Sequence, residues 1–370
     1  MLYVAEWDKE FKKTWSGTTY GLLKAGQKQE EIRELHLSHP NKILRAMFAF
    51  KTCIINGNFE TNMNFNINYQ NFSSKKVNDI LTKNYDSETR ILQIGDIASV
   101  KGSGIYQDLS VGYLANLFSK DPTAFKFSGF QRYSETELKN RMLVQNQRYG
   151  SARYIFTMSK FLREFLIKES GFPAEKVIHV GGGLNSISIE KNTEISKVKN
   201  RRRILFVGRD FYRKGGDLVV EAFSILKANY YYDAELYIVG PDHIEEKFKR
   251  KGVHFLGELS TKKTAFYFNL CDVFCMPSRF EAYGLVFPEA LASGLPCIGR
   301  SKFEMPNFID EGKTGYLLKK DDPQKLALMM ASLLANDEIF ENVKNNKALY
   351  IEKYSWNSVF KRIMKAYEKS

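Results

Sequence analysis

Apolar residues along this chain follow two spacings that alternate for most of its length. Short apolar runs bounded by Gly, Pro, Asn or Asp are typical of buried strands, whereas apolar residues three and four apart predict helices with one buried face. We expect strands at residues 2–5, 35–37, 91–94, 176–180, 204–208, 235–239, 253–256 and 272–276. We expect helical segments at 22–25, 43–50, 217–228, 261–269 and 354–366, with two long helices within 131–168. This alternation predicts two doubly wound α/β domains with parallel sheets.

A polar and charged segment, Ser186–Asn200, separates the two halves. We place an N-terminal domain at residues 1–190, a linker at 191–202 and a second domain at 203–352. The last segment, 353–370, is predicted to be a helix that packs on the edge of the second domain or crosses back to the first. A chain of 370 residues is long enough for two domains of ordinary size.

One stretch in the second half, residues 279–296, combines a loop, a short helix and a helix stop. Pro288 suits the first helical position, and Gly294 suits the handover to the next strand. The backbone amides from Gly284 to Phe287 would then converge on the helix N-terminus, which accepts an anion such as phosphate. We therefore regard this stretch as a candidate phosphate site.

Two carboxylates flank this candidate phosphate site, Glu281 in the loop and Glu289 in the first helical turn. Such a pair can accept hydrogen bonds from the hydroxyls of a sugar or a ribose. In the alternative interpretation Glu289 only complements the helix dipole, as acidic residues in a first turn commonly do. Local sequence leaves both interpretations open.

The stretch resembles the E-x7-E signature of family 4 of the retaining glycosyltransferases, with Glu281 and Glu289 as the two acids. The glycine-bearing loop and the Ala-Ser-Gly-x-Pro exit at 292–296 fit the same signature. The similarity is strong over 203–316, moderate over 149–185 and weak before that. It implies the GT-B architecture, in which two Rossmann-like domains face a deep interdomain cleft. It also implies a nucleotide-diphosphate sugar as donor, with a UDP-sugar favoured, bound mostly by the second domain.

A second candidate site lies in the loop between the strand at 204–208 and the helix at 217–228. Arg209 and Lys214 in this loop can bind a diphosphate. The guanidinium of Arg209 can donate two hydrogen bonds side by side, and the ammonium of Lys214 supplies a concentrated positive charge. The alternative is an ordinary solvated basic loop. The resemblance implies that an Arg and a Lys at these positions hold the diphosphate of the donor. Because these groups would take the charge-neutralising role of a metal, we expect no required metal or cofactor.

The resemblance assigns further roles around the donor. Glu281 would hold sugar hydroxyls far from the anomeric carbon, and Glu289 would hold the ribose hydroxyls. Stabilisation of the leaving diphosphate would come from the amides of Gly284, Leu285 and Val286. The turn at Gly257 and Glu258 resembles the place where relatives lay the nucleotide base against main-chain groups. The alternative for that turn is a plain connection from strand to helix.

The N-terminal half offers weaker candidates. Gly17 and Thr18 belong to a loop at the start of a predicted helix. The resemblance implies that this loop is the glycine loop that reaches the sugar and the acceptor. The alternative is a plain N-cap by Ser16 or Thr18. Asp96 follows the predicted strand at 91–94, and Asp108 follows a further predicted strand that begins at Ile105; open α/β sheets bind ligands at such ends, with a helix cap as the alternative for Asp108. Many relatives have a histidine in this region that faces the donor sugar. None of the five histidines of this chain is at the matching place, so Asp108 is the candidate there: the five are His36, His39, His179, His243 and His254.

The net charge of +13 indicates anionic partners, among them nucleotide phosphates and acidic membrane surfaces. One predicted helix within 131–153 is rich in basic residues, which we expect to form a solvated face; the alternative is contact with an acceptor or a lipid surface. These residues are Arg132, Lys139, Arg141 and Arg148. No arrangement of aromatic and basic residues resembles a nucleic-acid-binding module, so we expect no nucleic-acid partner.

The first residues carry acids where a signal peptide carries basic residues, and no apolar run approaches the ~20 residues that span a bilayer. We expect a cytoplasmic protein, with the inner face of a membrane as a peripheral location. The four cysteines are too scattered for a disulfide framework or a zinc site, and Cys271 and Cys275 are expected in the core.

These patterns together predict a retaining glycosyltransferase that moves a sugar from a nucleotide-diphosphate donor to a glycan or lipid-linked glycan acceptor, in polysaccharide or glycoconjugate biosynthesis. Two alternatives stay open. The first is a non-catalytic glycosyltransferase-like subunit that binds a glycosylated protein. The second is a nucleotide-sugar epimerase of the same architecture. Sugar transfer needs a separate acceptor and epimerisation does not, which distinguishes the two enzymes.

Overall fold

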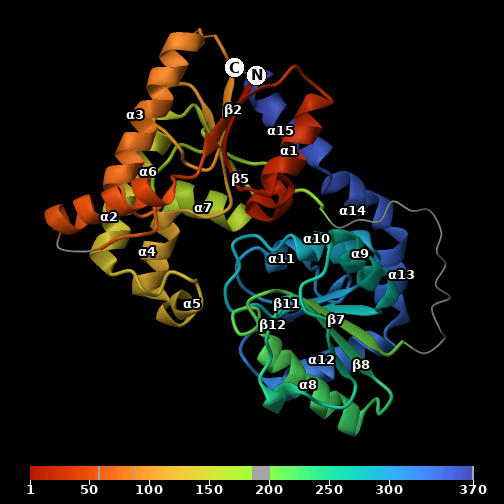
Figure 1. Ribbon diagram of the computed structural model, residues 1–370. Coiled ribbons are helices and arrows are strands. Elements are labelled where there is room, and N and C mark those ends of the chain that lie inside the picture. The colour runs from red at the N-terminus through yellow and green to blue at the C-terminus, as the bar shows by residue number, and fades with distance from the viewer. Residues whose placement is uncertain (57–58, 87, 186–200, 369–370) are drawn as a thin grey trace. The chain divides into compact units, whose positions relative to one another are not determined.

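A computed structural model of the chain describes residues 1–56, 59–86, 88–185 and 201–368 (Figure 1). The chain divides into two compact units. Unit 1 comprises Met1–Gly183 together with the chain from Trp356 onward, and unit 2 comprises Leu184–Ser355. The segment that we expect to be a linker, 191–202, lies outside the described residues up to 200.

Unit 1 is built on a sheet of six parallel strands in the order β2-β1-β3-β4-β5-β6. The strands are β1 (Leu2–Trp7), β2 (Arg33–Ser38), β3 (Ile91–Ile94), β4 (Gly104–Gln107), β5 (Tyr154–Thr157) and β6 (Val177–His179). The strand order reverses between β1 and β3, where Leu2 pairs with Arg33 on one side and Ile91 on the other. Reversal of the order creates a crevice at the carboxyl ends of these two strands.

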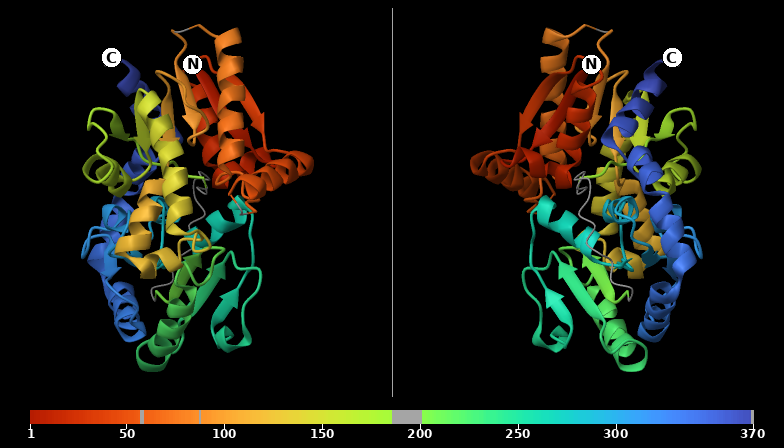
Figure 2. Two further views of the ribbon diagram at one scale, coloured as in Figure 1. Left: turned by 90° about the vertical axis from the view of Figure 1, so that its left-hand side faces the viewer. Right: turned by 90° about the vertical axis from the view of Figure 1, so that its right-hand side faces the viewer.

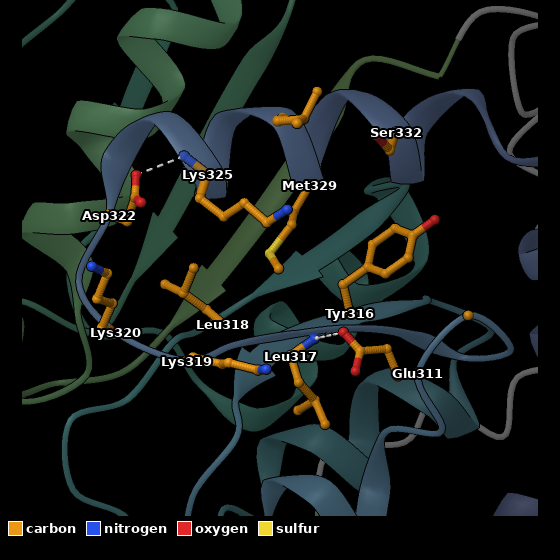
Figure 3. A pocket seen from close by; sticks show the side chains of 12 residues that line it. Glu311, Tyr316, Leu317, Leu318, Lys319, Lys320, Asp322, Lys325, Met329 and Ser332 are labelled. Atoms are coloured by element: carbon orange, nitrogen blue, oxygen red, sulfur yellow. Dashed lines mark hydrogen bonds between the residues drawn. The ribbon is translucent and has the colours of Figure 1, made fainter.

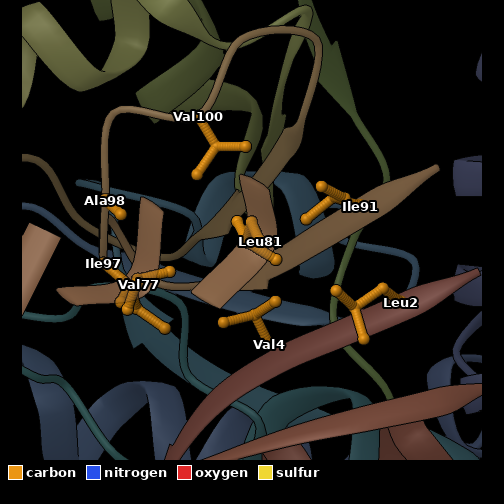
Figure 4. Packing of buried hydrophobic residues seen from close by; sticks show 8 residues of the cluster. All are labelled: Leu2, Val4, Val77, Leu81, Ile91, Ile97, Ala98 and Val100. Atoms are coloured by element: carbon orange, nitrogen blue, oxygen red, sulfur yellow. The ribbon is translucent and has the colours of Figure 1, made fainter. Parts of the chain in front are cut away.

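The helices of unit 1 cover both faces of this sheet. They are α1 (Thr18–Gln27), α2 (Lys42–Asn56), α3 (Ile67–Asn84), α4 (Val111–Lys120), α5 (Pro122–Lys126), α6 (Glu135–Ser151), α7 (Lys160–Lys168) and α15 (Trp356–Glu368), with a 3-10 segment at Phe11–Gly17. Successive side chains of a strand point to opposite faces. Leu2 and Val4 of β1 accordingly pack with Val77 of α3 (Figure 4), whereas the hydroxyl of Tyr3 donates to the carbonyl of Thr19 in α1 at 2.7 Å.

The terminal helix α15 packs within unit 1. The hydroxyl of Tyr367 donates to the carbonyl of Ile91 in β3 at 2.9 Å. The Trp356 ring lies so close to Gly21 of α1 that a Cβ there would be 2.3 Å from it, which explains a glycine inside that helix. The expected terminal helix therefore belongs to the same unit as β1 and α1, far from it in sequence.

Unit 2 repeats the architecture with another sheet of six parallel strands, in the order β12-β11-β10-β7-β8-β9. The strands are β7 (Arg203–Val207), β8 (Glu235–Val239), β9 (Val253–Phe255), β10 (Val273–Cys275), β11 (Cys297–Arg300) and β12 (Gly315–Leu318). The helices are α8 (Gly216–Asn229), α9 (Thr261–Leu270), α10 (Val286–Ala292), α11 (Met305–Phe308), α12 (Pro323–Ala335), α13 (Asp337–Asn345) and α14 (Lys347–Lys353), with a 3-10 segment at Glu246–Phe248. Here the order reverses between β7 and β10.

The expected fold class is confirmed in its main feature, because each unit is a parallel Rossmann-like α/β domain. The periodic apolar residues of the expected helix at 217–228 are buried in α8, and Cys271 and Cys275 lie in the core of unit 2. One expectation was inexact: α7 has nine residues rather than being a long helix. Within the described ranges, no helix has the length and apolar character needed to cross a membrane.

Candidate functional site

Two loops lie next to each other where the strand order of unit 2 reverses. One follows β7 and carries Arg209 and Lys214, and the other follows β10 and carries Glu281. The loops are joined by their backbones, because the amide of Arg279 donates to the carbonyl of Arg213 at 2.8 Å. Ligands of open α/β sheets bind at such reversal points. We call this region the β7–β10 site.

Lys214 and Glu281, which the sequence assigned to different parts of a donor, form a direct ion pair. Their side chains are 13% and 8% exposed, so both charges lie largely out of water. Burial lowers the pKa of Lys214, and the carboxylate of Glu281 acts in the opposite direction. Because a buried charge that loses its partner is costly, any ligand of the β7–β10 site meets the two groups as one unit.

Arg209 bonds to a different carboxylate. Its guanidinium is 72% exposed and donates to a carboxylate oxygen of Glu258 at 2.8 Å. The preceding Gly257 has a left-handed φ of 65°, and its carbonyl accepts from the amide of Gly240 at 2.8 Å. The loop after β7 thus meets the turns after β8 and β9. An exposed ion pair contributes little stability, so a phosphate can compete with Glu258 for Arg209 at small cost.

The helix next to Glu281 differs in detail from the expectation. α10 begins at Val286, so Pro288 occupies the third helical position rather than the first, where its missing N–H still costs nothing. Phe287 donates its amide to the carbonyl of Gly284 at 3.0 Å and is therefore not part of an amide cradle. Gly284 has a φ of 91°, and a Cβ there would lie 3.1 Å from the Glu281 side chain. The amides of Gly284, Leu285 and Val286 stay the candidates.

Glu289 does more than complement the helix dipole. It is 3% exposed, and its carboxylate accepts a hydrogen bond from the backbone amide of Asn185 at 3.0 Å. This bond fixes the start of unit 2 against α10. The other helix-end expectation holds, since Gly294 has a φ of 85° and its amide donates to the carbonyl of Leu291 at 2.9 Å.

A network of arginines, absent from the sequence-based candidates, holds the loop after β10. Arg279 donates to both oxygens of Asp217 at 2.7 and 2.9 Å and to Asp321 at 2.7 Å. Arg300 donates to the carbonyl of Ser278 at 3.0 Å and also pairs with Asp321. Although burial raises the pKa of Asp321, the bonds from both arginines outweigh it and hold that pKa below its usual value. Because these partners are far apart in sequence, no local pattern could reveal them.

Unit 1 has a cavity of about 290 Å³ at its own reversal point, at the carboxyl ends of β1, β3 and β4; we call it the β1–β3 cavity. Asp96 and Asp108 both line it. Asp108 accepts a hydrogen bond from the Trp15 indole at 3.2 Å. Its interpretation as a helix cap is wrong, because α4 is capped by Ser110, whose side chain accepts from the amide of Tyr113 at 3.1 Å.

The loop before α1 reaches this cavity through other residues than the two that we selected. Gly17 has a φ of 87° and caps α1 without a side-chain hydrogen bond, so a cap by Ser16 or Thr18 is wrong. The cavity is lined by Thr14, Trp15 and Thr19, and not by Gly17 or Thr18. Trp15 and Ser16 also adopt left-handed φ values of 47° and 56°, a strain that often marks functional loops.

The expectation of a solvated basic face on α6 is wrong for Arg141 and Arg148, which are 4% and 1% exposed. Arg141 donates to Asp96 at 2.7 Å. Burial lowers the pKa of Arg148 to about 10, and the Asp96 carboxylate opposes this change. Among the described atoms, Nη1 of Arg141 and Oε1 of Gln107 are buried without a partner, and both residues line the β1–β3 cavity. They offer a donor and an acceptor to a hydroxylated ligand.

His39, which the sequence did not place near Asp108, lines the same cavity. Its ring bonds to Asp8 at 3.1 Å and lies 3.6 Å from Glu6. Burial raises the pKa of Glu6, against which the charges of His39 and Arg148 act. The signal was present, because His39 directly follows β2.

The described lining of the β1–β3 cavity is acidic despite the positive charge of the chain: Glu6, Asp8, Asp96 and Asp108 face only His39 and Arg141 as basic groups. Carboxylates suit neutral sugar hydroxyls and repel phosphate. No three potential metal ligands cluster within the ranges that the structure describes.

A wider hollow of about 730 Å³ lies elsewhere in unit 2, between the edge strand β12 and α12 (Figure 3). Tyr316, Lys319 and Met329 line it, together with Asp322, whose carboxylate caps α12 by accepting a hydrogen bond from the amide of Lys325 at 2.8 Å. None of the site residues predicted from the sequence lines this hollow.

Comparison with known proteins gives this geometry a context. Residues 188–350 match the family model of glycosyl transferases group 1. The phosphatidyl-myo-inositol mannosyltransferase of Mycobacterium leprae is 27% identical over 200 residues, which cover 52% of this chain and 53% of that protein. The chain spans about half the length of the curated relatives that it matches.

Two solved structures share the fold of the whole chain at 14% sequence identity. WaaG, a glycosyltransferase involved in lipopolysaccharide biosynthesis, superimposes with a TM-score of 0.65 over 98% of each chain. Anabaena HepE in complex with UDP and glucose superimposes with a TM-score of 0.67 over 100% of each chain. Over residues 188–350 the chain is therefore similar to the group 1 glycosyl transferases, which confirms the glycosyltransferase resemblance seen in its sequence.

Proposed function

We propose that this chain is a retaining glycosyltransferase that moves a sugar from a nucleotide-diphosphate donor, most favourably a UDP-sugar, to a glycan or lipid-linked glycan. The observation that carries the proposal is the β7–β10 site, where Lys214, Glu281 and Arg209 surround the reversal point of the unit that matches the family model. The crystallised complex of Anabaena HepE with UDP and glucose supports the choice of donor.

The chemistry follows from the charges that develop on transfer. Breaking the anomeric C–O bond leaves an anionic nucleoside diphosphate and an electron-poor sugar. Arg209 and Lys214 stabilise the leaving diphosphate, aided by the amides of Gly284, Leu285 and Val286. Glu281 accepts hydrogen bonds from the sugar, and Glu289 accepts them from the ribose. The ion pair with Lys214 therefore holds the carboxylate of Glu281 where the diphosphate of the donor meets its sugar.

The β1–β3 cavity is the proposed place of the acceptor. Its acidic lining favours an uncharged sugar with free hydroxyls. Oε1 of Gln107 can accept a hydrogen bond from such a hydroxyl, and Nη1 of Arg141 can donate one to it. We assign the role of the catalytic carboxylate in this cavity to Asp108. The proposed stereochemistry is retention, with the acceptor attacking from the side of the leaving group and the phosphate helping to take its proton.

The donor half of the proposal is tested by thermal shift with UDP, GDP, ADP and dTDP. A ligand that binds only the folded state stabilises it by about 2.7 kcal/mol at a hundredfold excess over its Kd. We expect one diphosphate to raise the melting temperature, and Arg209→Gln to reduce that rise. Arg250→Gln, which removes another exposed arginine of unit 2, is the matched control. No response to any of the four nucleotides would contradict the donor site.

The reaction itself is tested with the responding nucleotide's sugars and a panel of neutral glycan acceptors. An α-configured donor should give an α-linked product by NMR, and a β-linked product would contradict retention. Conversion of the donor sugar without any acceptor would identify an epimerase. Nucleotide binding without turnover on any acceptor would favour the non-catalytic subunit.

A further inference from the structure

Helix α2 exposes a continuous apolar stripe. Ile43, Met47, Phe50 and Ile54 are 72%, 61%, 63% and 70% exposed. Because an α-helix turns by about 100° per residue, these four positions fall within an arc of about 60°. Isolated exposed apolar residues need no explanation, but a contiguous stripe marks an interaction surface.

The opposite face of α2 holds the helix on unit 1. Phe48 and Thr52 are buried against α3: the Phe48 ring lies 5.5 Å from that of Tyr69, and the Thr52 hydroxyl accepts from Asn68 at 3.1 Å. In Figures 1 and 2, α2 lies at the edge of unit 1, beside α3. The stripe therefore is not the inward face of a displaced helix, and no described residue of unit 1 buries it.

Charge narrows the choice of partner for this stripe. α2 contains Lys42, Arg45 and Lys51 and no acidic residue. On the same helical projection Lys42 and Lys51 fall on either side of the stripe. The adjoining α3 exposes Phe72, whose ring lies 5.2 Å from Phe48, next to Lys75 and Lys76, with Asp79 as the acidic residue there.

We propose that this surface of α2, made of the four stripe residues with Lys42 and Lys51, docks the protein onto an anionic membrane surface. A helix with one apolar face and basic flanks lies in the plane of the membrane interface, its apolar side chains among the acyl chains and its cations near acidic headgroups. A second copy of the chain is a poorer partner, because pairing the stripes would bring the basic flanks of both copies together. The proposal does not depend on the enzymatic activity.

The experiment is flotation of the full chain with vesicles of phosphatidylcholine alone or with about one third phosphatidylglycerol, a composition that carries the negative surface charge needed. We expect flotation with the anionic vesicles only, and a decline as salt rises. The triple variant Ile43→Gln/Phe50→Gln/Ile54→Gln should lower the apparent affinity by at least about tenfold, because binding scales with the apolar area that leaves water. Lys42→Gln/Lys51→Gln should lower it by a few fold and flatten the salt dependence.

Leu143→Gln is the matched control, because Leu143 is 64% exposed on α6 of the same unit and lies outside the proposed surface. It should bind vesicles as the unaltered chain does. Circular dichroism melts and sedimentation equilibrium on each variant separate loss of docking from loss of folding or of self-association.

The proposal is overturned if the unaltered chain does not float with anionic vesicles, or if the folded triple variant floats equally well. It is also overturned if the chain forms a dimer that the triple variant dissociates while vesicles bind neither form. None of these results bears on the donor site, because the assay contains no nucleotide sugar.

Discussion

The two units share one architecture, a six-stranded parallel sheet whose strand order reverses once, and they place opposite charges near that reversal. The β7–β10 site presents Arg209 and Lys214, whereas the β1–β3 cavity presents the carboxylates of Glu6, Asp8, Asp96 and Asp108. Each set of residues lies at or just beyond the carboxyl ends of strands at or near the reversal of strand order. Parallel sheets thus decide where a ligand can bind, and the residues of the loops decide which ligand it is.

The difference also concerns how the charges are balanced. In unit 2 the buried Lys214–Glu281 pair is neutral as a whole, and the exposed Arg209 adds a positive charge. In unit 1 the guanidinium of Arg141 pairs with Asp96, and its Nη1 is left without a partner. We therefore expect phosphate to discriminate between the units, and the following experiments test that contrast.

The largest effect is expected for Lys214→Met. It removes a cation from the leaving group and leaves Glu281 buried without its partner. We expect the transfer rate to fall by about 10²–10³-fold and the free energy of unfolding to fall by about 3 kcal/mol. Initial rates and urea unfolding measure the two losses. The double variant Lys214→Met/Glu281→Gln should regain stability but not activity; equal stability of all three proteins would show that the ion pair is not coupled.

Asp108→Asn addresses the other side of the contrast. It keeps the size of the side chain that accepts from Trp15 and removes the charge. We expect transfer to fall by about 10²-fold or more, as for loss of a catalytic carboxylate, while the UDP-induced melting shift stays unchanged. Glu175→Gln, an exposed change in unit 1, serves as control. A reduced UDP shift in Asp108→Asn would show that the two sites are not separate in function.

Acid should weaken unit 1 through His179 at the end of β6. Burial lowers the pKa of His179 to about 4, helped by the charges of Lys160 and Arg362. Because the folded state binds this proton more weakly than the unfolded state, stability falls as the pH drops below about 6.5 and continues to fall down to about 4. The loss approaches about 2 kcal/mol at pH 5. Urea unfolding at pH 7 and pH 5 should show this loss, and His179→Gln should remove it, whereas His243→Gln in unit 2 should not.

The smallest effect is expected for Glu258→Gln, and it has the opposite direction. Glu258 competes with phosphate for Arg209, and its negative charge repels the diphosphate. Because exposed ion pairs contribute about 0.2–1 kcal/mol, UDP should bind about twofold to fivefold more tightly. Isothermal titration of UDP measures the change, with Glu246→Gln as the exposed control. Weaker binding would mean that Glu258 itself contacts the nucleotide.

Local patterns in the sequence predicted the elements of both units well. The apolar runs at 2–5 and 204–208 became β1 and β7, and the periodic residues of 217–228 became the buried face of α8. Such patterns are reliable because burial of a strand or of one helical face depends on neighbours within a few residues. The same locality explains why Asp96, Asp108 and Lys214 could be chosen after the ends of predicted strands, and Glu281 in the loop before a predicted helix.

The sequence by itself determined two parallel α/β domains and a set of charged loop residues that fit sugar transfer. Only the tertiary structure decided how those residues pair. It joined Lys214 to Glu281 across 67 positions and Arg148 to Gln70 across 78, and it buried the arginines of α6 that looked solvated. The apolar pattern of a helix predicts that one face is buried. It does not predict which residues pack against that face, because those residues come from elements distant in sequence. The charge of a site is therefore a property of the fold, although each of its charges is a property of the sequence.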